Sequence, residues 1–466
     1  MIIAIEILLF IALIFCYFYA PEQISAPYLS IVIVLVLASY MVLYVRKKTR
    51  QFLRRSFLSN TNIFLLLFFI LCFQFPIDYI LGNDLNFPNY FYSYKTINLS
   101  TTFNALCFVA FTIGSIFTIE TKHVSKSLST NEQKVRLIPT KPILIFMYLL
   151  WVGFIIFLNP EYVNGGHGTV LINSISVACY GYFWRLNVIY LAITLYNMRG
   201  REKVSIRDTI RMHSWRYWLV ILLSALLFFM AHNRVYTFYI LTPTFFYMLS
   251  MAKIRTKPLV SIAIILVVAV FFTLFKIFGL DNMFSEGSLN AADYVTYDRF
   301  SSFSPFTSEL AASIFADSTL FYIWYTQGIV VLGSTLVLGV LRTVSGLVPL
   351  FFMVTGLSEN TYESASYVSS LMSMGYGLGS SVTGDLIVSV GFIGAILIMF
   401  LFGRICIYGD IYLFGGAKRY MGILIGLCVS SQIVFVSRSS LTDMIAAILF
   451  GLLFSHFYFK FYKIHN

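Results

Sequence analysis

The chain has 466 residues, of which 59% are hydrophobic and 11% are charged. Soluble domains carry about 25% charged residues, so this balance excludes a soluble globular protein and indicates a multi-pass membrane protein. The net charge of +12 would also suit a nucleic-acid-binding protein, but the basic residues lie mainly in loops between apolar runs, which favours a membrane topology.

Twelve apolar runs approach the length of about 20 residues that crosses a hydrocarbon core. The first run has no basic residues before it and a second run follows at once, so we interpret it as a span and not as a signal peptide. The runs fall at 2–20, 28–45, 62–82, 101–119, 142–159, 176–197, 217–233, 235–252, 258–277, 385–403, 421–437 and 440–459.

Basic residues gather in every second connection between these runs and account for 25 of the 32 Lys and Arg. The positive-inside rule places these connections, and both termini, in the cytoplasm. They are 46–55, 121–141, 198–216, 253–257, 404–419 and the C-terminal tail. The seven basic residues outside them are Lys95, Arg185, Arg234, Lys276, Arg299, Arg342 and Arg438.

One apolar stretch, residues 329–357, breaks this alternation if it is counted as a span. It contains Arg342 and Pro349, so we expect it to be re-entrant or to lie along the outer membrane surface. The predicted fold is an all-α integral membrane protein with about 12 transmembrane helices. Its expected parts are a nine-span bundle (1–277), a large periplasmic loop (278–384) and a three-span bundle (385–466).

The six cysteines lie in or beside apolar runs without the spacing of metal ligands, so we interpret them as packing residues. The sequence contains no HExxH or DxD motif and no Walker-type glycine loop. We therefore expect no metal and no cofactor, and these absences argue against an ATP-driven pump and a cytoplasmic nucleotide-sugar transferase.

Arg185 lies within the run at 176–197, where a charged side chain costs several kcal/mol unless it faces water, a partner or an anionic ligand. It either forms a structural pair with Asp78 or another buried acid, or lines an anion-binding cavity open to the outside.

Arg234 and Arg438 each lie in a tight turn between two runs, and Arg342 lies on the stretch 329–357. They either anchor the chain at the interface or bind phosphate, for which the planar guanidinium is well suited. Together with Arg185 they suggest an amphiphilic ligand with more than one negative charge, such as a polyprenyl pyrophosphate.

Asp385 follows a glycine-rich loop and begins the run at 385–403. An acid at this position is a candidate general base for a sugar hydroxyl, and a helix cap or a salt bridge to an arginine is the alternative. His232, two residues before Arg234, is a second candidate for a base or a phosphate donor. Glu309, Glu359 and Glu363 are loop acids without a distinguishing context.

Four segments carry a resemblance to the Wzy-type O-antigen and capsule polymerases, which are oligosaccharide repeat-unit polymerases of bacterial membranes. They are AHNRVYTFYILTPTFFYML (231–249), GSTLVLGVLRTVSGLVP (333–349), GLGSSVTGDLIVSVGFIGAILIMFLFG (377–403) and SRSSLTDMIAAILFGLL (437–453). The resemblance covers the C-terminal half, and the first 200 residues only through hydropathy. Two features depart from the family pattern: the segment around Arg342 is degenerate, and Ile387 stands where an aromatic residue is usual.

The resemblance implies a fold similar to GT-C glycosyltransferases and transfer of a growing glycan from undecaprenyl pyrophosphate onto a lipid-linked repeat unit. The reaction would occur at the periplasmic face of the bacterial inner membrane, without a metal. Asp385 and His232 would be catalytic, and Arg185, Arg234, Arg342 and Arg438 would bind the pyrophosphate. A chain-length regulator protein is a further candidate partner, and nucleic acid is not. Candidates for binding the glycan or the acceptor are Arg299, Trp324, Tyr376 and Asp443.

Two other functions are compatible with the same features. An O-antigen ligase would use the same donor with a different acceptor. A lipid-linked oligosaccharide flippase or other transporter would be expected to show paired repeats or broken helices, and the sequence indicates neither.

Overall fold

The computed structural model describes most of the chain as helices, 16 in the part that it covers. The described residues are 2–45, 57–83, 94–120, 137–159, 174–198, 204–230, 234–252, 302, 304, 307, 313–358, 362–371, 380–415 and 419–462. Each predicted apolar run that falls in these ranges is a helix, whereas the predicted span at 258–277 lies outside them.

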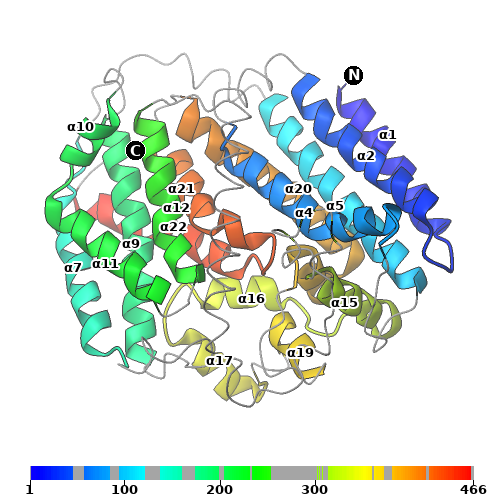
Figure 1. Ribbon diagram of the computed structural model, residues 1–466. Helices are drawn as coiled ribbons and strands as arrows, with labels where there is room; N and C mark the ends of the chain where they lie inside the picture. The colour runs from blue at the N-terminus through cyan, green and yellow to red at the C-terminus, as the bar shows by residue number, and fades with distance from the viewer. Residues whose placement is uncertain are drawn as a thin grey trace.

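Two groups of helices stand on either side of the molecule (Figure 1). The first group consists of α1 (Ile2–Phe18), α2 (Ala26–Val45), α4 (Asn60–Ile80) and α5 (Tyr94–Glu120). The second consists of α7 (Lys141–Ile156), α9 (Ser174–Met198), α10 (Ile206–Arg211), α11 (Trp215–Met230) and α12 (Arg234–Met251).

Three C-terminal helices join the two groups: α20 (Val382–Phe414), α21 (Tyr420–Val436) and α22 (Thr442–Phe461). Helix α20 packs on α5, and α21 packs on α4, α9 and α12. The short helices α15 (Ser313–Gln327), α16 (Ser334–Leu341), α17 (Leu347–Thr355) and α19 (Ser364–Leu371) lie in the lower half of the molecule in Figure 1, with α17 and α19 at its lower edge.

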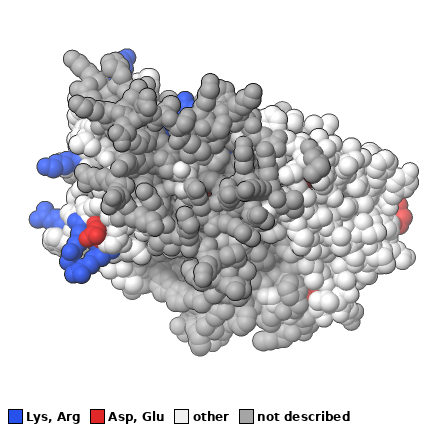
Figure 2. All heavy atoms as spheres, turned by 90° about the horizontal axis from the view of Figure 1, so that it is seen from above, with Lys and Arg blue, Asp and Glu red and all other residues white. Residues whose placement is uncertain are grey.

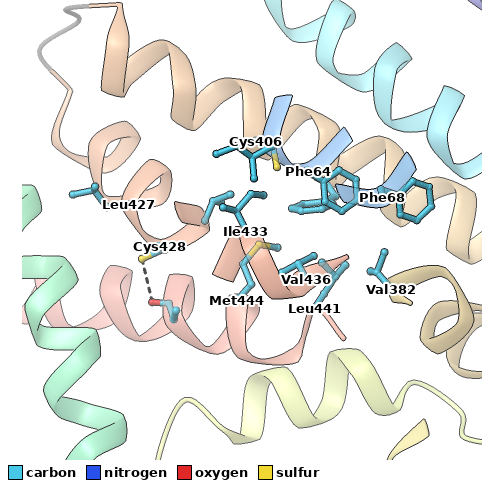
Figure 3. Close-up of a cluster of buried hydrophobic side chains, with 14 of the residues drawn as sticks. Phe64, Phe68, Val382, Cys406, Leu427, Cys428, Ile433, Val436, Leu441 and Met444 are labelled. Carbon is cyan, nitrogen blue, oxygen red and sulfur yellow. Dashed lines mark hydrogen bonds between the residues drawn. The ribbon is translucent and has the colours of Figure 1, made fainter. Parts of the chain in front are cut away.

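The core is apolar and centres on α21. Figure 3 shows side chains of α4, α20, α21 and α22 converging there, including Phe64, Cys406 and Ile433. The thiol of Cys428 donates to the carbonyl of Ala447 at 3.6 Å, which joins α21 to α22. All six cysteines are free and four of them are fully buried, as expected for packing residues.

Helices α5 and α20 cross with their backbones in close contact. A Cβ atom at Gly114 would lie 2.0 Å from the carbonyl oxygen of Phe400, and one at Gly403 would lie 2.1 Å from that of Phe111. Small residues allow such an approach, which is how helices pack tightly in a bilayer. The glycines therefore fix the position of α20, the helix that carries Asp385.

At the other end of α20, Asp410 fixes the start of α4. Its carboxylate accepts from the backbone N–H groups of Asn60 and Thr61, both at 2.9 Å, and from the Thr61 hydroxyl at 2.7 Å. The first N–H groups of a helix have no partner within the helix, so a carboxylate there satisfies them and matches the helix dipole.

Helix α20 is broken at Gly391, whose φ of 76° and ψ of 180° are not helical. The break frees carbonyls in the preceding turn, and the segment 330–335 occupies them. The N–H groups of Val330 and Val331 both donate to Val388 O at 3.2 Å, and that of Gly333 donates to Ser389 O at 2.7 Å. The sequence analysis did not anticipate this broken helix, because glycine is common in unbroken membrane helices as well.

Five helices in the described part are long and apolar enough to cross a membrane: α2, α4, α5, α20 and α22. Another four, α1, α7, α11 and α21, are apolar but shorter. The chain is therefore a multi-pass membrane protein by length and composition. The described part holds fewer helices of this length than the twelve expected spans, and one of those, 258–277, lies outside it. Helices α16 and α17 divide the stretch 329–357 into pieces of 8 and 9 residues, each far shorter than the roughly 20 residues of a span.

Exposed basic side chains gather at one edge of the upper face, where α10 and the start of α11 carry Arg207, Arg211 and Arg216 (Figure 2). The chain begins at this end of the bundle, and α20 ends there. The starts of α20 and α22 lie at the opposite end, with α16, α17 and α19. We call this opposite end the site end.

Candidate functional site

The site end brings together segments that are far apart in the sequence. Helix α20 begins beside the end of α21, since the Val382 N–H donates to the Ser437 carbonyl at 3.3 Å. Helix α16 packs on both α20 and α22, and α19 packs on α20. Helices α9 and α12 reach the same region, so seven helices meet there.

Arg342 is the centre of an ionic cluster at the site end. It caps the C-terminus of α16, and one of its terminal nitrogens lies 2.9 Å from a carboxylate oxygen of Glu363. The other lies 3.4 Å from Asp443, in the first turn of α22. About a quarter of the Arg342 and Glu363 side chains is exposed, so the cluster is open on one side.

Asp443 is held by a second helix. The hydroxyl of Tyr239 on α12 donates to its other carboxylate oxygen at 2.8 Å. Asp443 therefore has one oxygen fixed by α12 and one paired with Arg342. Its negative charge also attracts the guanidinium of Arg185.

Arg185 lies in the middle of α9 and is 8% exposed. Its Nη1 donates to the carbonyl of Arg342 at 2.8 Å and, more weakly, to that of Thr343 at 3.4 Å. A cation at the free carbonyls of a helix C-terminus is favourable, so Arg185 stabilises the end of α16. The predicted alternative, a pair between Arg185 and Asp78, is not formed, although the structure describes both residues. The carboxylate of Asp78 accepts a hydrogen bond from the Ser302 hydroxyl at 2.8 Å.

The Nε atom of Arg185 is buried and has no hydrogen-bond partner. The guanidinium lies over the ring of Phe450 at 5.8 Å from its centroid. A buried donor without a partner is expensive, at about 1–3 kcal/mol. Arg185 thus retains capacity to bind an anion.

The cluster holds as many carboxylates as guanidinium groups. Arg342 pairs with both Glu363 and Asp443, whereas Arg185 donates to backbone carbonyls and interacts with Asp443 through its charge. Burial alone would lower the pKa of Arg342, but the negative charges of Asp443 and Glu363 outweigh it and hold the pKa above its usual range. Arg342 is therefore charged in this arrangement, and a guanidinium also stays charged when it binds phosphate.

Asp385 lies in the first turn of α20, next to this cluster, and is 2% exposed. The hydroxyl of Thr335 donates to one of its carboxylate oxygens, and the hydroxyl of Ser364 donates to the other. Asp385 thereby ties α16 and α19 to the start of α20. Its predicted role as a general base stays a prediction, and both of its oxygens are occupied in this arrangement.

A second buried acid, Asp317 of α15, fixes the start of α20 from the other side. It accepts from the Ser381 N–H at 2.6 Å, and Ser381 is the N-cap residue of α20. Burial raises the pKa of Asp317 to about 7, although the Ser381 hydrogen bonds oppose the shift. Gly384 leaves room for this carboxylate, since a Cβ there would lie 2.5 Å from its Oδ1.

The other predicted site residues are placed less centrally. Arg438 lies half-buried in the turn that precedes α22, and Arg234 begins α12. Trp324 stacks on Phe392 at a centroid distance of 5.9 Å, so one face of its ring is covered. His232, Arg299 and Tyr376 lie outside the described residues.

Glu363 is the member of the cluster that the sequence analysis did not single out. It was treated as an ordinary loop acid because its partner Arg342 lies 21 residues away in the sequence. Little in the sequence indicated this pairing. Glu363 precedes a short Ser-rich segment, and nothing in that segment predicts contact with α16. Among the residues that the structure describes, no three His, Cys, Asp or Glu side chains are grouped as metal ligands would be.

Comparison with protein-family models, with curated proteins and with solved structures found no match for this chain. The resemblance to the polymerases therefore depends on the short motifs alone.

Proposed function

We propose that the chain is a metal-independent glycan polymerase of the bacterial inner membrane, with a GT-C-like bundle. It transfers a growing glycan from undecaprenyl pyrophosphate onto a lipid-linked oligosaccharide repeat unit. In this proposal both termini are cytoplasmic and the site end faces the periplasm.

The observation that carries the proposal is the meeting of Arg185 and Arg342 at the site end, beside the partly exposed carboxylates of Glu363 and Asp443. Two guanidinium groups near lipid depth suit a ligand that is both an anion and an amphiphile. Such a pair is hard to explain by topology, because basic residues on the outer side are disfavoured.

The chemistry of the transfer fits these side chains. Negative charge grows on the pyrophosphate as it leaves the sugar, and guanidinium groups fixed beforehand stabilise that charge without having to reorganise. The acceptor hydroxyl needs a base. Asp385 and His232 are the candidates from the sequence, and Glu363, which lies beside Arg342, is a third.

A deletion strain tests the proposal by gel analysis of its surface polysaccharide. Loss of a polymerase leaves lipid cores that carry a single repeat unit, whereas loss of a ligase leaves cores without any repeat. Restoration of long chains by the wild-type gene and not by Asp385→Asn would support the proposal. Normal long chains in the deletion strain would refute it.

A lipid-linked oligosaccharide transporter is a second candidate, and the broken helix α20 favours it. Transporters often bind substrate where helices are interrupted near the middle of the bilayer. The break at Gly391 lies nearer the site end, nine residues after α20 begins. Purified protein in vesicles separates the two functions: a transporter would move lipid-linked units across the bilayer, and a polymerase would join units on one side.

A further inference from the structure

We propose that Glu363 is the general base of the transfer reaction, and that the lipid pyrophosphate releases it from Arg342 on binding. This inference rests on the proposed function, and it assigns a role to a residue that neither the motifs nor the resemblance indicated.

The resting cluster leaves little room for an anion on Arg342. Its two terminal nitrogens already face Asp443 and Glu363, so a phosphate oxygen must take the place of one carboxylate. Two carboxylates also balance the charges of Arg342 and Arg185. An anionic ligand therefore binds most favourably when one of the two carboxylates moves away from Arg342.

Glu363 is the carboxylate that can move. Asp443 is fixed by the Tyr239 hydroxyl at 2.8 Å and lies in the first turn of a 20-residue helix. Among the described residues, the second oxygen of Glu363 has only the hydroxyl of Ser366 as a partner, at 3.4 Å and three residues along the same segment. Asp443 thus keeps one side of Arg342 oriented while the other side changes partner.

The displaced carboxylate would be well placed for proton transfer. Glu363 is about 25% exposed, whereas Asp385 is 2% exposed and accepts a hydroxyl on each oxygen. Ser364, the next residue, is held by Asp385, so the backbone at Glu363 stays fixed while its side chain turns. Asp385 is in this view a positioning residue.

The acceptor hydroxyl oxygen bonds to the anomeric carbon as the bond from that carbon to the pyrophosphate oxygen breaks. The hydroxyl proton passes to the Glu363 carboxylate, and the electron pair of the broken bond leaves with undecaprenyl pyrophosphate. Arg342 and Arg185 meet the charge on that leaving group.

The test compares Glu363→Gln with Asp443→Asn in detergent micelles, using undecaprenyl pyrophosphate as the binding probe and lipid-linked repeat units for chain elongation. Glu363→Gln keeps the size of the side chain but cannot accept the proton. We expect it to bind the probe as tightly as wild type or more tightly, and to elongate chains at least about 100-fold more slowly. Asp443→Asn should weaken both binding and elongation, because it frees Arg342 from its fixed partner.

Glu363→Ala with added formate provides an independent readout. A small carboxylate that restores elongation identifies a missing base, which a purely structural role would not predict. Normal elongation by Glu363→Gln, loss of probe binding by that variant, or no recovery with formate would each overturn the inference. Wild-type protein that neither binds the probe nor elongates chains would instead refute the proposed function.

Discussion

The glycine crossing of α5 and α20 gives a prediction whose magnitude follows from the structure. In Gly403→Ala the new Cβ would lie 2.1 Å from the carbonyl oxygen of Phe111, about 1.3 Å inside an ordinary contact of 3.4 Å. The atom that it meets belongs to the backbone, so no side-chain rotation relieves the clash and the helices must separate. The hydrogen bond from the Ser115 hydroxyl to Gly403 O, at 3.1 Å, would be lost as well.

Overpacking of this kind lowers the free energy of unfolding by about 1–3 kcal/mol. The higher helix propensity of alanine offsets at most about 1 kcal/mol of this loss. We expect the melting temperature of the purified protein in detergent, followed by fluorescence-detected size-exclusion chromatography, to fall by several degrees. Gly181→Ala is the matched control, since a Cβ there meets nothing within 4 Å. Equal melting temperatures for the two variants would refute the reasoning.

Three further predictions concern the site end. Gly391→Ala forces a side chain into a backbone conformation that favours glycine, so the variant should be less stable than Gly181→Ala by about 1–3 kcal/mol in the same melting assay. Burial raises the pKa of Asp317 to about 7, so the contribution of the protonated side chain to stability is full below about pH 4 and is lost as the pH rises through 7. Melting temperatures measured between about pH 5 and 9 should show this decline. The variant Asp317→Asn should remove the pH dependence. Arg185→Lys replaces the planar guanidinium, which can donate two parallel hydrogen bonds, by a compact ammonium, and it should slow chain elongation about tenfold or more. Arg404→Lys, near the other end of α20, is the control and should not slow elongation.

The hydropathy pattern predicted the helices well because each apolar run is a local property of the chain. The run at 385–403, for example, corresponds to α20 at Val382–Phe414. In the described part, fewer helices are long and apolar enough to cross a membrane than the runs suggested, because apolarity does not distinguish a crossing helix from a shorter buried one. Helix α21 has only 17 residues and lies in the core, surrounded by other helices.

The candidate site was predictable in part. Arg185, Arg342, Asp385 and Asp443 stand out in the sequence because charge is rare in apolar runs, and the structure brings all four to the site end. Their partners were not predictable, since the pairing depends on contacts between distant segments. Glu363 looks like any loop acid until α19 is placed against α20.

The state of Arg185 shows why charge alone does not identify an anion site. The ionic cluster is neutral at rest, so its net charge resembles that of any structural salt-bridge network, and such networks are weak evidence of function. What distinguishes it is donor capacity that the protein leaves unused, since the Nε of Arg185 is buried without a partner. In the proposed exchange, Arg342 also gives up Glu363 while Asp443 fixes its other side. A ligand with several acceptor oxygens suits two guanidinium groups that are held by different helices, because each group can then take an oxygen of its own.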